Sequence, residues 1–210
     1  MTWRGTLALG LLLVLGAGGG FAASMTAGEH PDGSGAAVPV AAASPGLPVD
    51  PAPETVADPL TAPLAPSLPL VERRTGRGKD VVTLSVPDGW IKNDLSVKEW
   101  TWRPPDQPMY AYVLRVEQVR GDREPIARLI ANRKVALDQD EVDVRFESET
   151  ADSLHFTYIA DQHLRHGLLK WVPVPGTTVA QVEVAISGRA VDVPGMEDLI
   201  ERVAASATMG

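Results

Sequence analysis

Two closely spaced histidines are the residues of this chain that most directly suggest metal binding. His163 and His166 are three positions apart, and two imidazoles can share one divalent cation. They fall in a stretch, 163–174, whose pattern predicts a β-strand, and side chains three positions apart on a strand point to opposite faces. We therefore expect two separate polar histidines, and no metal or cofactor.

An acidic stretch, residues 138–149, has the length of a calcium-binding loop. Position six of such a loop needs a glycine and is here Asp143, and a strand pattern follows where a helix should begin. The same carboxylates could instead act as an acid–base pair. The chain would then be a hydrolase or transferase directed at the cell wall, which we consider as an alternative to a binding function. Acidic residues at a helix end are typically solvated, so this alternative is not favoured.

A serine-based relay has its residue types but not its arrangement. Asp152, Ser153 and His155 are almost adjacent in sequence, and such a short segment cannot place three side chains in series. No Gly-x-Ser-x-Gly motif is present either. The sequence therefore predicts a protein that is not an enzyme.

Aromatic residues on predicted strands are the remaining candidates for a binding site. Such side chains bury a large area on binding at low entropic cost. Their other interpretation is as core residues that cover the sheet, which is what we expect of Trp90. The candidate binding residues are Trp100, Trp102, Tyr110, Tyr112 and Trp171.

The elements that carry these side chains follow from the hydrophobic periodicity. Residues 124–137 and 196–207 have helical spacing, and seven other segments have the alternation or composition of strands. Short connections between the last four strands favour antiparallel pairing, and the last two form a hairpin at Pro175 and Gly176. The sequence thus predicts an α+β domain, an antiparallel β-sheet sandwiched between helices. The predicted strands are 82–86, 97–103, 109–119, 142–147, 154–158, 163–174 and 177–186.

Residues 1–24 have the pattern of an export signal. Arg4 precedes the aliphatic run 7–15, and small residues follow up to a plausible cleavage point after Ala22 or Ala23. The uncharged stretch 6–23 is also just long enough to span a bilayer, so a cleaved signal peptide and a retained membrane anchor are both open. In either case we expect the rest of the chain to be extracytoplasmic, secreted or held at the outer face of the plasma membrane.

Residues 25–78 are rich in Pro and Ala and contain few large apolar residues. Frequent prolines remove backbone donors and restrict the backbone, so this segment is predicted to be a disordered linker, with the folded domain at 79–210. A basic cluster at its end, 72–79, is either a solvated boundary or a contact with anionic lipid or wall polymer.

Composition excludes several partners and chemistries. The net charge of -8 argues against nucleic acid as a partner. Cysteine is absent, which excludes disulfides, thiolate metal sites, a cysteine nucleophile and a lipid-modified cysteine.

Four stretches follow one another in a recognisable order: residues 82–90 (Val-Thr-Leu-Ser-Val-Pro-Asp-Gly-Trp), the helix 124–137, residues 154–158 (Leu-His-Phe-Thr-Tyr), and the closing strand and helix from 182 to 207. In these stretches the chain resembles the Mog/PsbP-like superfamily, in particular the LpqN-type exported proteins of high-GC bacteria. The resemblance covers about residues 80–207 and implies a PsbP-like α/β/α sandwich. It also implies a non-enzymatic accessory module that binds a protein or another envelope component, and it transfers no active-site residues. LpqN-type proteins are commonly lipoproteins, and the missing cysteine departs from that pattern. A spacer domain without a ligand is a further alternative.

Overall fold

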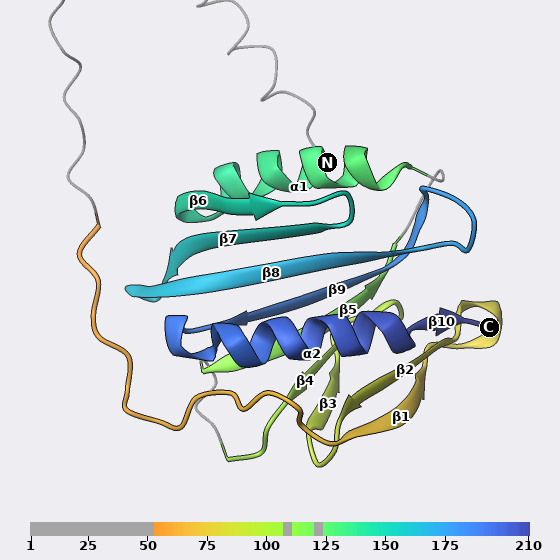
Figure 1. Ribbon diagram of the computed structural model, residues 1–210, viewed down its shortest axis with the longest axis horizontal. Helices are drawn as coiled ribbons and strands as arrows, with labels where there is room; N and C mark the ends of the chain where they lie inside the picture. The colour runs from red at the N-terminus through yellow and green to blue at the C-terminus, as the bar shows by residue number, and fades with distance from the viewer. Residues whose placement is uncertain (1–52, 107–110, 120–123) are drawn as a thin grey trace, which may run out of the picture. The chain divides into compact units, whose positions relative to one another are not determined.

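The computed structural model describes residues 53–106, 111–119 and 124–210, which form mainly antiparallel strands and two α-helices (Figure 1). This confirms the predicted α+β class with an antiparallel sheet. The elements are β1 (Leu70–Thr75), a 3-10 turn η1 (Gly78–Asp80), β2 (Val82–Pro87), β3 (Ile91–Asp94), β4 (Glu99–Arg103), β5 (Tyr112–Gln118), α1 (Ile126–Asp140), β6 (Val142–Glu149), β7 (Ser153–Ala160), β8 (His163–Pro173), β9 (Ala180–Gly188), a 3-10 turn η2 (Ala190–Asp192), α2 (Val193–Ser206) and β10 (Thr208–Met209).

The strands form two antiparallel sheets. The larger has the order β3-β4-β5-β9-β8-β7-β6, and the smaller has the order β1-β2-β10. The predicted hairpin is confirmed, because β8 pairs with β9 on either side of Pro175 and Gly176. The last two long strands therefore lie side by side in the middle of the larger sheet.

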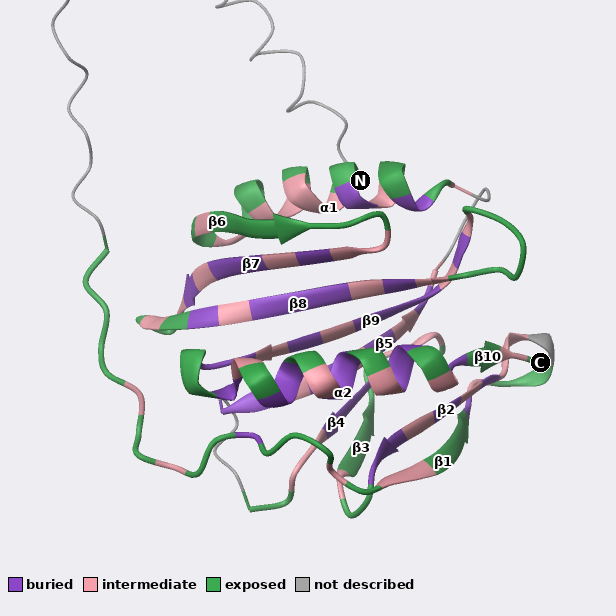
Figure 2. Ribbon diagram, in the orientation of Figure 1, coloured by how far each residue is buried: buried purple, intermediate pink, exposed green. Residues whose placement is uncertain are grey.

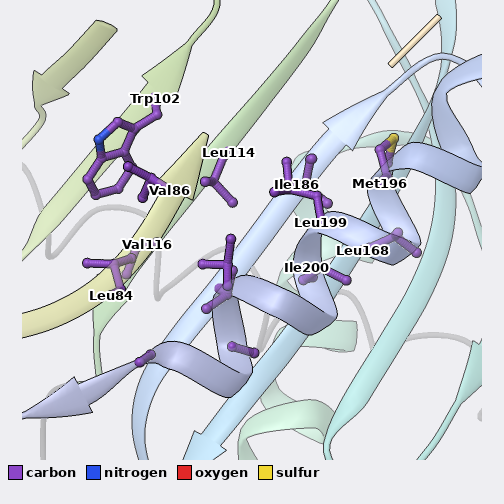
Figure 3. Packing of buried hydrophobic residues seen from close by; sticks show 14 of the residues in the cluster. Leu84, Val86, Trp102, Leu114, Val116, Leu168, Ile186, Met196, Leu199 and Ile200 are labelled. Carbon is purple, nitrogen blue, oxygen red and sulfur yellow. The ribbon is translucent and has the colours of Figure 1, made fainter. Parts of the chain in front are cut away.

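Helix α2 covers the apolar face of β8 and β9. Pro194 lies in its first turn, where a missing backbone donor costs nothing, and Met196, Leu199 and Val203 recur at helical spacing on its buried face. Figure 3 shows Met196 and Leu199 on the side of α2 that faces Ile186 and the neighbouring strands, and Val203 belongs to the same cluster. The main core thus lies between α2, the larger sheet and the smaller sheet.

Alternate residues of β8 belong to different clusters. Leu168 packs with the α2 cluster, whereas Leu169 and Trp171 pack with Ile126 and Ile130 of α1. Successive side chains on a strand point to opposite faces, so the two helices contact the sheet through opposite sets of residues.

The linker prediction, residues 25–78, is wrong from residue 53 onward. Residues 70–75 form β1, which pairs along its whole length with β2. Its charged side chains had suggested a solvated boundary, but an edge strand tolerates exposed charges. Residues 25–52, like the predicted signal or anchor 1–24, lie outside the described residues.

Residues 56–68, here called the strap, form neither helix nor strand and lie on the domain (Figures 1 and 2). Leu64 is 4% exposed and belongs to the main core. A Cβ atom at Gly195 would collide with the carbonyl oxygen of Leu64, so a glycine at the start of α2 allows this approach. The strap ends where Arg202 Nη2 donates to the carbonyl of Leu68 (2.8 Å) and Asp198 accepts from the amide of Ser67 (2.7 Å).

A buried ion pair holds the middle of the strap. Asp192 is 0% exposed and accepts hydrogen bonds from the Arg189 side chain (2.8 Å) and from the amide of Leu64 (2.9 Å). The Arg189 guanidinium donates in turn to the carbonyls of Pro59 and Ala62. Burial opposes ionisation of Asp192, but these hydrogen bonds outweigh it and lower the pKa of its carboxyl group below the ordinary value of 3.8.

Among the described residues, no helix is long and apolar enough to cross a membrane.

Replacing Leu64 with Ala should lower the free energy of unfolding by about 2–5 kcal/mol, because it removes a buried side chain and leaves a cavity. Leu60→Ala is the matched control, since Leu60 lies on the same strap and is fully exposed, and it should change stability by less than about 0.5 kcal/mol. Urea denaturation of both variants measures this. Equal stabilities of the two variants would show that the strap is not part of the core.

Asp192→Asn should cost about 3–5 kcal/mol at pH 7, because it leaves the Arg189 charge buried without its partner. The folded-state pKa of Asp192 is depressed, so its contribution is complete at neutral pH. It is lost as the pH falls from about 4 through the lower folded-state pKa. Urea denaturation from pH 7 to pH 3 should therefore show that the difference in free energy of unfolding between wild type and variant becomes smaller at acidic pH. A gap that stays constant with pH would contradict the ionised state of Asp192, and Asp106→Asn, at an exposed position, serves as control.

Candidate functional site

The candidate site lies on the second face of the larger sheet, the face that α1 contacts. On β4, β5 and β9 one set of alternate residues enters the main core, and the other set is largely polar. Cross-strand pairing places Val113 of β5 opposite Ser187 of β9, and Arg115 opposite Ala185. The polar set is Glu99, Thr101, Arg103, Val113, Arg115, Glu117, Glu183, Ala185 and Ser187.

Helix α1 covers only part of this face. Its buried residues Ile126 and Ile130 pack on Phe156, Leu169 and Trp171 of β7 and β8. Between α1 and the sheet a depression of about 390 Å³, here called the sheet groove, opens over β4, β5 and β9 and reaches β7 and β8. Its lining is more apolar than polar and consists of Leu95, Thr101, Arg103, Val113, Arg115, Arg133, Leu137, Glu141, Phe156, Tyr158, Gly167, Leu169, Ala185, Ile186 and Ser187.

A glycine shapes the floor of the sheet groove. Gly167 of β8 is paired with Phe156 of β7, and a Cβ atom at this position would collide with the Phe156 ring. The ring can therefore lie across the neighbouring strand, as glycine in a strand often permits.

One carboxylate fixes α1 to the sheet at the groove. Glu183 on β9 accepts hydrogen bonds from Arg133 of α1 (2.7 and 2.8 Å) and from Arg115 of β5 (2.6 Å). Arg115 also pairs with Glu99 (2.9 Å) and Glu117 (3.2 Å). Burial disfavours the charge on Arg115, but these carboxylates outweigh it and raise the pKa of the guanidinium. Two of the arginines that line the groove are thus structural and already neutralised.

A second depression of about 300 Å³, here called the arginine cavity, adjoins the sheet groove. The two share Arg103, Val113, Tyr158 and Ser187, so they form one continuous site. The cavity is lined by Arg103, Tyr112, Val113, Tyr158, Ala160, Asp161, Arg165 and Ser187.

The tyrosines of the cavity are hydrogen-bond donors at neutral pH. Burial raises the pKa of the hydroxyl groups of Tyr112 and Tyr158 above the ordinary value of 10.0. Both therefore stay protonated and uncharged.

The predicted aromatic binding surface does not agree with the burial of its members. Trp100, Trp102 and Trp171 are each at most 2% exposed and pack in the two cores. Trp100 and Trp102 lie on the face that α2 covers, and Trp171 lies on the opposite face against α1, so the three do not form one surface. Of the remaining two, Tyr112 is 8% exposed and reaches the arginine cavity, and Tyr110 lies outside the described residues.

Trp90, predicted to belong to the core, is only partly buried. It packs against the edge of the main core and stacks on Tyr112 with 5.7 Å between ring centroids.

The histidines do not form a shared metal site in the described chain. His163 Nδ1 lies 3.0 Å from the carbonyl oxygen of Val56 on the strap, and His166 Nδ1 lies 3.1 Å from Nε2 of His155. Burial, with a smaller effect of His155, lowers the pKa of His166 below its ordinary value of 6.5. The described residues contain no group of three or more metal-ligating side chains.

The residues of the relay considered above bond elsewhere. Ser153 Oγ lies 2.6 Å from Thr150 Oγ1, and His155 pairs with His166. Asp152 lies 3.5 Å from Lys170.

The acidic stretch is only partly dispersed, because Asp143 and Glu147 line one depression together. Asp138 and Asp140 are exposed at the end of α1, and Asp143 pairs with Arg145. Glu149 pairs with Lys134 of α1 (2.9 Å).

Sequence reasoning missed the arginines of the site. A signal was present, since Arg103 and Arg115 lie on strands opposite buried neighbours and so had to face a different environment. What the sequence did not indicate was that Arg133 and Arg165 join them from distant elements.

The fold and site define an α+β domain with an arginine-lined depression on its sheet. No protein-family model matches the chain, and no curated protein matches it. The PsbP-like assignment is therefore carried by the sequence resemblance alone.

Trp102→Ala should lower the free energy of unfolding by about 3–5 kcal/mol, because the indole fills the main core at 1% exposure. Ile91→Ala on the neighbouring strand β3 is the control, since Ile91 is 60% exposed, and it should have little effect. Chemical denaturation measures both. A Trp102 variant of unchanged stability would return this residue to the list of binding candidates.

Proposed function

We propose that this protein is an exported, non-enzymatic binding module of the bacterial cell envelope. In this proposal its domain is a PsbP-like α/β/α sandwich, and it binds a protein or another envelope component through the sheet groove and the arginine cavity. The observation that carries the proposal is the sheet face that α1 leaves partly uncovered. A structural scaffold would gain stability by filling such a depression.

The proposed location follows from the export pattern of residues 1–24. The domain is then either secreted or held at the outer face of the plasma membrane. Contact with the membrane itself is limited to residues 6–23 if they are retained.

The composition of the site favours binding over hydrolysis. Glycoside hydrolysis usually needs two carboxyl groups facing one another. Glu141 is the one acid that lines the sheet groove and Asp161 is the one acid that lines the arginine cavity, so neither depression by itself contains a pair. The wall-directed hydrolase or transferase is therefore the weaker alternative for this site, and it would act at a separate depression that Asp143 and Glu147 line together.

The spacer alternative also fits less well. A domain that only holds other parts apart has no need for two depressions that adjoin over one sheet face. Their continuity distinguishes them and not their size, because other depressions of the described surface have volumes of about 270, 500 and 440 Å³.

Site-specific photo-cross-linking tests the proposal in the cell envelope. A benzoylphenylalanine placed at Val113, which lines both depressions, should form a covalent adduct with an envelope protein or wall component. The same group at Val135, on an exposed position of α1, should form none. Mass spectrometry of the adduct identifies the partner.

Two outcomes would count against the proposal. One is the absence of a reproducible adduct from position 113, and the other is equal adducts from positions 113 and 135, which would indicate collisions and not a site.

A further inference from the structure

Two guanidinium groups with unused hydrogen-bonding capacity line the arginine cavity. Arg103, at the end of β4, makes no ion pair within the described part of the chain. Arg165, at the start of β8, is 5% exposed and makes only some of its possible hydrogen bonds.

Of the two terminal nitrogens of the Arg165 guanidinium, only Nη1 donates hydrogen bonds to described residues. Its Nη1 donates to Asp58 of the strap (2.7 Å) and to the carbonyl of Leu164 (2.9 Å). Its Nη2 is buried and makes no hydrogen bond to any described residue. An unpaired buried donor is costly, and guanidinium groups characteristically hold carboxylate or phosphate through two nitrogens. A ligand oxygen that reaches Nη2 would remove this cost.

Arg165 is paired with Asp58 (2.7 Å), whereas Arg103 has no ion-pair partner in the described part of the chain. Asp161, in the exposed turn between β7 and β8, is the one carboxylate among the residues that line the cavity. The hydroxyl groups of Tyr112 and Tyr158 are protonated and add no negative charge. The charge of Arg103 and the Nη2 of Arg165, which no described residue engages, therefore favour an anion.

We propose that the arginine cavity binds a carboxylate or phosphate group of the ligand, held by Arg103 and Arg165, with the rest of the ligand extending past Val113 into the sheet groove. This inference rests on the proposed binding function and names the chemistry of what is bound. The more apolar lining of the groove suits the uncharged part of such a ligand.

Titration of the full chain by NMR at low ionic strength and pH 7 tests the inference. Inorganic phosphate and butyrate should each produce saturable shifts at the amides of Val113 and Ser187 and at Nε–H of Arg103. Butyramide, which has the shape of butyrate without its charge, should not. Arg103→Gln should weaken binding of both anions about tenfold, as expected for one charge-assisted contact.

Arg128→Gln is the matched control variant. Arg128 is an exposed arginine of α1 that pairs with Glu124, and its replacement should leave anion binding unchanged. Arg165→Gln should also weaken binding. If loss of its bond to Asp58 prevents folding, the Arg103 variant decides the question.

The source of the anionic group is resolved by a third probe. Soluble dihexanoyl phosphatidylglycerol, used below its micellar concentration, should bind more tightly than inorganic phosphate if the group is a lipid headgroup. Equal or weaker binding assigns it to a soluble or polymer-borne ligand.

The anion inference is overturned by three results: no saturable shift with either anion, equal shifts with butyramide, or unchanged binding by Arg103→Gln. An adduct from position 113 without anion binding would leave the proposed function standing and remove this inference alone. Anion binding without any adduct in cells would leave the anion site standing and remove the proposed function in the envelope.

Discussion

The ion pair between Arg189 and Asp192 is the constraint on which most of the architecture depends. It lies where β9 ends and α2 begins, and both partners are at most 3% exposed. A buried pair is tolerated only when its hydrogen bonds are nearly all satisfied. Here the strap supplies the hydrogen-bond partners that the pair does not provide for itself, namely the backbone groups of Pro59, Ala62 and Leu64. The pair therefore fixes the start of α2 and the course of the strap together.

The two faces of the larger sheet are covered differently as a result. With α2 and the smaller sheet fixed on one face, that face is filled by apolar side chains and accounts for most of the core. On the other face α1 packs its apolar residues Ile126 and Ile130 on β7 and β8, and an ionic network around Glu183 joins it to β5 and β9. The apolar packing of α1 is thus confined to one part of this face, and the groove and the cavity lie over the remainder.

Much of the sheet could be predicted from alternation, because apolar residues at every second position, such as Leu114 and Val184, indicate a strand whatever its neighbours in the sheet are. The strap could not, since its binding depends on backbone carbonyls and on one leucine, Leu64, among prolines. Their partners lie more than 120 positions away. For the aromatics, alternation placed Trp100 and Trp102 on one face but could not tell whether that face was covered. The arginines of the site could not be grouped from the sequence either, because pairing between strands distant in sequence brings them together.

Arg165 connects the strap to the proposed site. Its Nη1 donates to Asp58, while its Nη2 makes no hydrogen bond to any described residue. Because the two nitrogens are distinct, an anion on Nη2 does not have to displace Asp58 from Nη1. The bond to Asp58 also keeps the guanidinium in place before a ligand arrives, which reduces the entropy lost on binding. The same proline-rich segment that leads toward the N-terminus thus preorganises the cavity, and ligand binding and attachment of the strap are expected to reinforce one another.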